Sequence, residues 1–189
     1  MFAKHSYYAH SAQDELGNLL PYEHWQTLQN HASNVGNLAA TFAQIFGADE
    51  IARYTGQLHD LGKYSEAFNH RLHGGPSVDH ATAGAKIAVE RWGNVIGKLM
   101  AFCIAGHHAG LPDCGSNTDN GGESTLSGRL KKKIEDYQAY QPEIEVPLLH
   151  SAPIDPKAVP NPYFSLSFFI KICASCRSCT YQYSYLHIR

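Results

Sequence analysis

Apolar residues recur at spacings of three and four along most of the first 110 residues, which is the period of amphipathic helices. The first such segment ends near Gly47, and a second begins around Asp49, a residue type that often caps helix N-termini. A third helix is predicted after Asp79, and a fourth stops where Gly110 and Pro112 interrupt the pattern. The apolar positions of these four segments are Val35, Leu38, Ala39, Phe42, Ile45 and Phe46; Ile51, Tyr54, Thr55, Leu58 and Leu61; Ala83, Ile87 and Val89; and Val95, Ile96, Leu99, Met100, Cys103 and Ile104.

The remainder of the chain is less regular. Residues 114–122 are rich in Gly, Ser, Asn and Asp and are expected to form a loop. A fifth helix is predicted over 124–140, and the prolines within 141–162 favour an extended connection. Residues 164–172 are strongly apolar and begin a further element. No alternating strand pattern occurs, so the sequence predicts an all-α helical bundle with room for one domain.

Net charge and cysteine content limit the classes of protein to which the chain can belong. With a net charge of −2, the molecule is no general binder of polyanions, so metal ions or local basic groups would have to hold a nucleic acid. The one dense basic run, 131–133, is predicted mainly to solvate a helix face, and otherwise to line a path for a nucleic-acid strand. An odd number of cysteines, a polar N-terminus and the lack of an 18-residue apolar stretch predict a cytoplasmic protein without disulfides or membrane spans.

Histidine is the outlier in composition, with 12 copies against 15 lysines and arginines together. Four different predicted helices each have a histidine at or near one end: His31, His59, His80 and His107. A helical bundle can bring such ends to one interior point, and imidazole is the commonest protein ligand of transition metals. We take many of the other histidines to be ordinary surface residues.

Two pairs of neighbours, His59-Asp60 and His107-His108, strengthen the interpretation as a metal site. Successive residues on a helix project about 100° apart, so adjacent ligands straddle a site rather than share one point on it. That arrangement suits two cations about 3.5–4 Å apart with a bridging carboxylate. The predicted ligands of one or two divalent ions are His31, His59, Asp60, His80, His107 and His108.

The same segments resemble the HD nuclease domain of the CRISPR type I nuclease–helicase, within the HD superfamily of metal-dependent phosphohydrolases. The resemblance is carried by Leu28–His31 with Val35, by Gly56-Gln57-Leu58-His59-Asp60-Leu61-Gly62-Lys63, by Asp79-His80-Ala81, and by Ala105-Gly106-His107-His108-Ala109-Gly110. All of these motifs fall within residues 28–110. The His-His-Ala-Gly segment separates this branch from other HD phosphohydrolases.

This resemblance implies an HD-domain helical bundle that cleaves DNA, mainly single strands, by hydrolysing phosphodiester bonds with metal-activated water. It implies that the six residues above are ligands of Mn, Ni, Co, Fe or Mg ions. It also implies catalytic roles for Asp60 and for Lys63, a cationic group near the scissile phosphate; a surface lysine is the competing interpretation. The implied setting is CRISPR type I interference in the bacterial or archaeal cytoplasm, with a Cascade-type complex and a helicase as partners.

The sequence departs from that family in two respects. No helicase follows within the chain, so we expect either that DNA unwinding comes from another polypeptide or that the chain is a fragment of a longer one. The family carries a further aspartate on a late helix, whereas no Asp or Glu occurs here after Asp155. We therefore divide the chain into an HD nuclease domain over 1–172 and an atypical tail over 173–189, such as a frameshift or truncation would give. The cysteines of that tail, Cys173, Cys176 and Cys179 with His187, fit an accidental cluster better than a zinc or iron–sulfur site.

Two other functions stay open on the sequence. An HD phosphohydrolase of nucleotides or cyclic dinucleotides would use the same chemistry in a closed pocket. An inactive HD docking module would fit the missing late aspartate, because one metal position would then lack a ligand. The loop over 114–122 and the lysine run favour a polymeric substrate over a small one.

Overall fold

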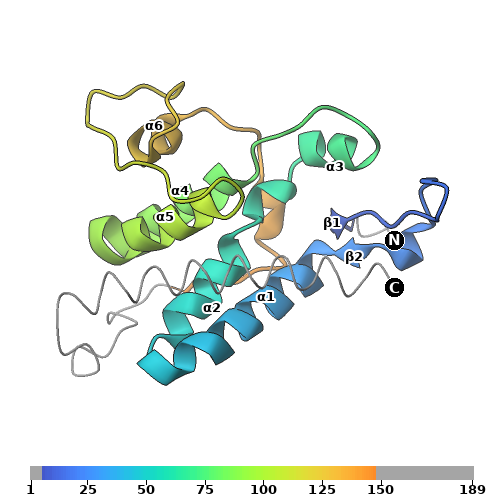
Figure 1. Cartoon of the computed structure of the whole chain (residues 1–189), viewed down its shortest axis with the longest axis horizontal. Helices are drawn as coiled ribbons and strands as arrows, with labels where there is room; N and C mark the ends of the chain where they lie inside the picture. Colours follow the sequence, from blue (N-terminus) through green and yellow to red (C-terminus); the bar gives the residue numbers. More distant parts are fainter. Residues whose placement is uncertain (1–5, 148–189) are drawn as a thin grey trace.

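The computed structural model describes residues 6–147, which form two helical hairpins with short elements around them (Figure 1). The helices and strands are β1 (Tyr8–His10), β2 (Gln26–Thr27), α1 (Leu28–Ala43), α2 (Asp49–Leu58), α3 (Glu66–Leu72), α4 (Ala81–Trp92), α5 (Lys98–Gly106) and α6 (Leu126–Lys131). Single 3-10 turns lie at Tyr22–His24, Gln44–Phe46, Leu61–Lys63 and Gln138–Tyr140, and a π-helical turn at Gly93–Gly97. The predicted all-α class is confirmed.

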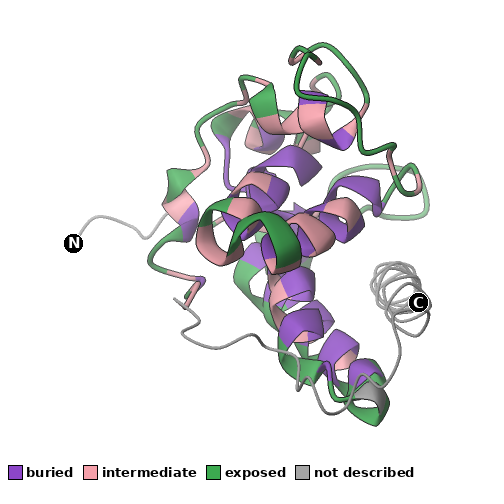
Figure 2. Ribbon diagram, turned by 90° about the vertical axis from the view of Figure 1, so that its left-hand side faces the viewer, coloured by how far each residue is buried: buried purple, intermediate pink, exposed green. Residues whose placement is uncertain are grey.

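The core lies where the hairpin α1–α2 meets the hairpin α4–α5. Figure 2 shows the buried residues of these helices on the faces that they turn toward one another. Leu58 from α2, Ala85 from α4 and Ile104 from α5 are each almost fully inaccessible. The buried positions of α4 are mostly Ala, with Gly84 among them, so the helix axes can approach closely.

The buried face of α1 differs from the predicted one. Phe42 is 42% exposed and Ile45 84% exposed, although both belong to the predicted apolar face. The helix instead turns its small residues toward α2, and a Cβ atom added at Gly56 would lie only 2.9 Å from Cα of Gly36. Such close packing leaves no room for a phenyl ring or a branched chain, so the bulky residues at the end of α1 face outward.

Several short elements were not predicted. Helix α3 begins behind Ser65, whose hydroxyl accepts a hydrogen bond from the backbone N–H of Phe68. Strands β1 and β2 pair antiparallel, but three and two residues are too few to produce a recognisable alternation. Two boundaries also differ: Ala48 rather than Asp49 caps α2, and α5 begins at 98 behind the π-helical turn.

The predicted fifth helix over 124–140 is wrong beyond its first part, because α6 ends at Lys131. The ammonium group of Lys131 donates hydrogen bonds to the carbonyl oxygens of Asn117 and Asp119, both at 2.6 Å. Lys132 forms an ion pair with Asp79 at 2.8 Å. Lys131 therefore binds the loop before α6 and Lys132 binds Asp79, just before the start of α4, whereas the predicted role was to solvate a helix face.

Residues 148–189 lie outside the described part of the chain. The predicted apolar element over 164–172, the boundary after residue 172 and the tail cysteines are therefore untested predictions. Within residues 6–147, no helix has both the length and the apolar character that crossing a bilayer requires.

Candidate metal centre

The ends of four helices meet inside the bundle and bring the predicted ligands together. His31 lies in the first turn of α1, and His59 directly follows α2. His80 directly precedes α4, and His107 directly follows α5. The two helical hairpins thus each contribute two imidazoles to the same interior point.

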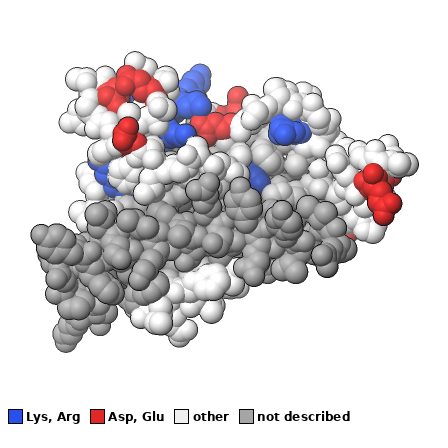
Figure 3. Space-filling view, in the orientation of Figure 1, with Lys and Arg blue, Asp and Glu red and all other residues white. Residues whose placement is uncertain are grey.

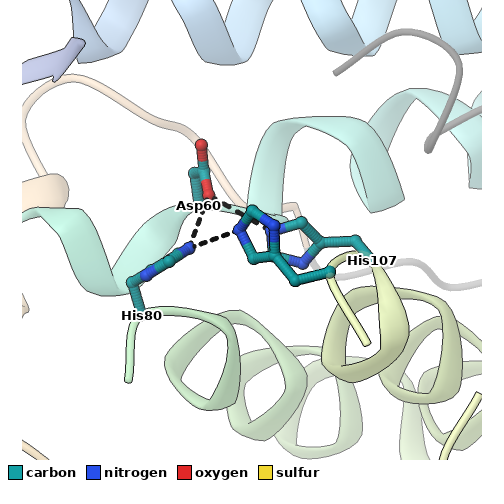
Figure 4. Close-up of side chains that lie close together, drawn as sticks. Asp60, His80 and His107 are labelled. Carbon is teal, nitrogen blue, oxygen red and sulfur yellow. Dashed lines mark hydrogen bonds and ion pairs between the residues drawn. The ribbon is translucent and has the colours of Figure 1, made fainter. Parts of the chain in front are cut away.

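Asp60, only 2% exposed, lies between these imidazoles. Its oxygen Oδ2 is 3.1 Å from Nε2 of His31 and 3.2 Å from Nε2 of His59. Its other oxygen, Oδ1, is 3.5 Å from Nε2 of both His80 and His107, and Figure 4 shows these three side chains pointing toward one another. Each carboxylate oxygen therefore faces one pair of imidazoles, as in a ligand that bridges two cations.

The ligand atoms form two sets, each compact enough for one ion. In the first set, one atom each from His31, His59 and Asp60 lie within 4.8 Å of one another. The second set joins Asp60 to His80, His107 and His108 under the same limit. Nε2 of His108 is 2.8 Å from Nε2 of His80. Asp60 belongs to both sets, so the geometry accommodates either one or two ions.

Hydrogen bonds on the far side of four of the rings leave Nε2 as the nitrogen that could bind a metal ion. Nδ1 of His59 donates to the carbonyl oxygen of Gly56 at 2.6 Å, and Nδ1 of His107 donates to that of Ile104 at 2.7 Å. A carbonyl oxygen only accepts hydrogen bonds, so the proton must sit on Nδ1 and the lone pair on Nε2. Both carbonyls lie three residues before the histidine, which is the geometry that a helix C-terminus supplies.

The other two anchors come from different parts of the chain. Nδ1 of His80 lies 3.2 Å from the carbonyl oxygen of Val78. Nδ1 of His31 lies 3.1 Å from Oε1 of Gln26, the only side chain among these four anchors. Gln26 belongs to β2, so the two-stranded ribbon contributes to the orientation of a ligand.

The donor set fits divalent cations. Nε2 of His31 is 3.2 Å from Nε2 of His59, and with both protons on Nδ1 neither ring can donate to the other. Within residues 6–147, Oδ1 of Asp60 and Nε2 of His107 are buried without a hydrogen-bond partner. Such unsatisfied groups cost about 1–3 kcal/mol each. Imidazole and carboxylate ligands suit divalent transition metals, which would satisfy all of these lone pairs.

Lys63 is buried beside the same carboxylate. Lys63 is only 5% exposed, so the interpretation as a surface lysine is wrong. Nζ lies 2.8 Å from Oδ2 of Asp60, donates to the carbonyl oxygen of Ala9 at 3.1 Å, and sits 5.1 Å from the ring centre of Phe68. The ammonium group therefore holds β1 against the metal centre and adds positive charge there.

Burial and nearby charge set the protonation of the ligands. Burial alone would raise the pKa of Asp60, but His59 and Lys63 hold that pKa well below its usual value. Burial lowers the pKa of His31 and of His80. Burial, together with His107, lowers the pKa of His108 to about 4. An ionised carboxylate and neutral imidazoles are the forms that bind metal ions.

Two glycines allow the ligand-bearing segments to touch. The backbone N–H of Gly62 donates to the carbonyl oxygen of His80 at 3.1 Å, and a Cβ atom there would lie 2.5 Å from that oxygen. A Cβ atom at Gly84, on α4, would collide with the carbonyl oxygen of Leu58 at the end of α2. Glycine at these positions sets the distance between His80 and the His59-Asp60 pair.

Sequence reasoning missed some residues that support the centre. Asp79 was predicted only to precede a helix and to belong to a motif. Its carboxylate accepts hydrogen bonds from the N–H and the hydroxyl of Thr82, and so caps the start of α4 next to His80. Aspartate three residues before threonine at a helix start is a signal that could have shown this role. Gln26 gave no such signal, because the short strand that carries it was not predicted.

A groove of about 410 Å³ opens beside the centre. Two of the predicted ligands, His80 and His108, line it together with Lys63, and α3 contributes Arg71. No Asp or Glu is among the described residues that line it. On the face shown in Figure 3, the acidic and basic side chains of the described residues form small groups, some of them side by side.

Comparison with known proteins agrees with this geometry. A family model described as "HD domain" matches residues 28–137, which is more than half of the chain and spans all six predicted ligands. Members of that family are metal-dependent phosphohydrolases. No curated protein matches the chain at a significant level.

Proposed function

The chain belongs to the HD-domain family, and we propose that it is a metal-dependent nuclease that hydrolyses single-stranded DNA in CRISPR type I interference. The observation that carries the hydrolase chemistry is the position of Asp60, whose two oxygens face two separate pairs of imidazole Nε2 atoms. The step from phosphohydrolase to DNA nuclease is supported by the His-His-Ala-Gly segment at 107–110 and by the cationic lining of the groove.

When bound, divalent ions at such a centre lower the pKa of water to about 7 and offset the charge of a phosphate. His31, His59, His80, His107 and His108 would hold the ions with Asp60. The protein's own contribution is orientation, because anchored Nδ1 atoms fix four of these rings before an ion arrives, those of His31, His59, His80 and His107. Lys63 adds a positive charge at the groove wall, where a substrate phosphate would pass.

The proposed biological setting follows the same resemblance. A helicase domain or a separate helicase chain would deliver single-stranded DNA, and a Cascade-type complex would select the target. A chain with a net charge of −2 gains little from long-range attraction to DNA, so delivery by a partner would make up for weak binding.

The test is degradation of circular single-stranded DNA by the purified chain with Mn²⁺ or Ni²⁺, and with EDTA. We expect metal-dependent loss of the circle, which an exonuclease could not produce. Asp60→Ala should abolish the loss, while Asp113→Ala, an exposed acid in the loop after α5, should retain it. Loss of linear but not circular single-stranded DNA would identify an exonuclease, and survival of both with folded, metal-loaded wild-type protein would contradict the proposal.

One observation favours a second candidate, a phosphohydrolase of nucleotides or cyclic dinucleotides. The groove volume of about 410 Å³ lies in the range of pockets that enclose small ligands. Release of phosphate or mononucleotides from such substrates, with the DNA circle left intact, would select this candidate. Metal-loaded protein that hydrolyses neither kind of substrate would favour the inactive docking module instead.

A further inference from the structure

His10, at the end of β1, is a half-buried histidine that the metal centre does not use. Its Nε2 atom is buried and has no hydrogen-bond partner within residues 6–147. The His10 ring packs edge-on against the ring of His31, with ring centres 5.1 Å apart, and this contact holds it in place. Buried polar atoms in folded proteins nearly always have a partner, so a lone Nε2 at a groove indicates a missing ligand.

The geometry separates His10 from the metal ligands. The two sets of described residues whose ligand atoms lie within 4.8 Å of one another do not include His10. His10 instead lines the groove, as do its neighbour Ser11 and the more distant Ser77. The missing ligand of Nε2 is therefore a group in the groove rather than an ion at the centre.

The lining indicates what kind of group this is. Lys63 and Arg71 are the charged residues of the groove, and no acid accompanies them among its described lining residues. Arg71 forms no ion pair with a carboxylate anywhere in residues 6–147. Two cations with hydroxyl and imidazole donors suit an anion rich in acceptor oxygens, and a phosphoryl group beside a phosphohydrolase centre has that chemistry.

We propose that His10 is a substrate-binding residue, whose Nε2–H donates a hydrogen bond to a non-bridging phosphoryl oxygen of a phosphodiester in the groove. The inference rests on the proposed phosphodiester chemistry, but not on DNA as the substrate. It assigns β1 to the active site, with the Lys63 bond to the Ala9 carbonyl keeping the strand in position.

The experiment uses His10→Phe, which keeps an aromatic ring against His31 but removes the donor. His10→Gln restores an N–H at similar reach, and His24→Phe is the matched control on an exposed histidine outside the groove. The probe is bis(4-nitrophenyl) phosphate, hydrolysed with Mn²⁺ at pH 8. We expect KM to rise roughly tenfold in His10→Phe, the range for a hydrogen bond to a charged group. His10→Gln should recover most of this loss, and bound metal should stay at the wild-type level.

A second readout needs no turnover. Binding of the same diester to EDTA-treated protein, followed by broadening of its aromatic NMR signals, should weaken in His10→Phe and not in His24→Phe. Unchanged KM and unchanged binding in His10→Phe would overturn the inference. Loss of bound metal would also overturn it, because His10 would then be a ligand. Hydrolysis of the diester without degradation of circular or linear single-stranded DNA would refute the nuclease proposal, whereas the KM of His10→Phe would still decide the role of His10.

Discussion

The two halves of the metal centre use the same residue types but meet solvent differently. His31 and His59, from the α1–α2 hairpin, are 0% and 1% exposed. His80 is half-buried and His108 is exposed, and both line the groove beside α4 and α5. Asp60 belongs to both halves. The enclosed half is suited to retaining an ion, and the open half is where a substrate can reach one.

The two halves also differ in the number of ligands. The enclosed set has three residues, so the loss of one leaves two. The open set has four, so the loss of one leaves three, which is the protein ligand number of many catalytic metal sites. The enclosed set therefore has no spare ligand, whereas the open set on the other side of Asp60 has one.

We expect the largest effect from His59→Ala, which removes a ligand from the enclosed set. Activity should fall by more than about 100-fold, beyond the 10–100-fold typical of outer-shell changes. The measurement is bound metal per chain by mass spectrometry together with kcat/KM. His70→Ala, on the exposed side of α3, is the matched control.

His108→Ala should reduce activity less, by roughly tenfold, because three ligands of the open set remain. Bound metal should decrease less than in His59→Ala under the same dialysis. Equal losses in the two variants would show that the enclosed and open sets bind ions as one unit.

Gln26→Leu should weaken metal binding by about tenfold, because it removes the acceptor that fixes Nδ1 of His31. Competition with a coloured chelator measures the affinity directly. Gln44→Leu, exposed at the far end of α1, should leave it unchanged. Wild-type affinity in Gln26→Leu would mean that packing alone orients the His31 ring.

The metal-free protein should lose stability as the pH falls below about 6.5, the value for histidine in an unfolded chain. Burial is the main cause that lowers the pKa of His10 to about 3 and that of His108 to about 4. In that window the unfolded chain binds protons that the folded chain excludes, so the free energy of unfolding decreases with falling pH. Asp60, whose pKa is lowered, adds a loss in the same direction at more acidic pH.

Urea denaturation of EDTA-treated protein at pH 7, 6 and 5 measures this dependence. His108→Asn, which cannot take up a proton in this range, should flatten the slope. A free energy of unfolding that stays constant or rises as the pH falls would contradict the assignment of neutral, buried imidazoles.

The smallest effect is expected from Lys132→Met, which removes the ion pair with Asp79 behind His80. The pair is partly exposed to solvent, so the free energy of unfolding should fall by less than about 1 kcal/mol. The hydrogen bonds from Thr82 still hold the Asp79 carboxylate. Lys133→Met is the control, and a loss of bound metal in Lys132→Met alone would show that this pair positions His80.

The local spacing of residues predicted much of the fold. Helix period and helix-ending residues located α1, α2, α4 and α5, because these signals depend on neighbours within a few positions. The histidines at their ends were recognised for the same reason. The short elements β1, β2 and α3 were missed, since so few residues carry no clear periodicity.

The sequence by itself determined which residues could bind metal and that each sits at the end of a helix, because residue chemistry and helix period are local properties. The tertiary structure alone decided that Asp60 lies between two sets of ligands, that Lys63 is buried and that Phe42 faces outward. It also brought His10 to His31 and to the groove. These outcomes depend on how closely the helical hairpins pack, and that distance is set by glycines and alanines whose contacts are distant in the chain.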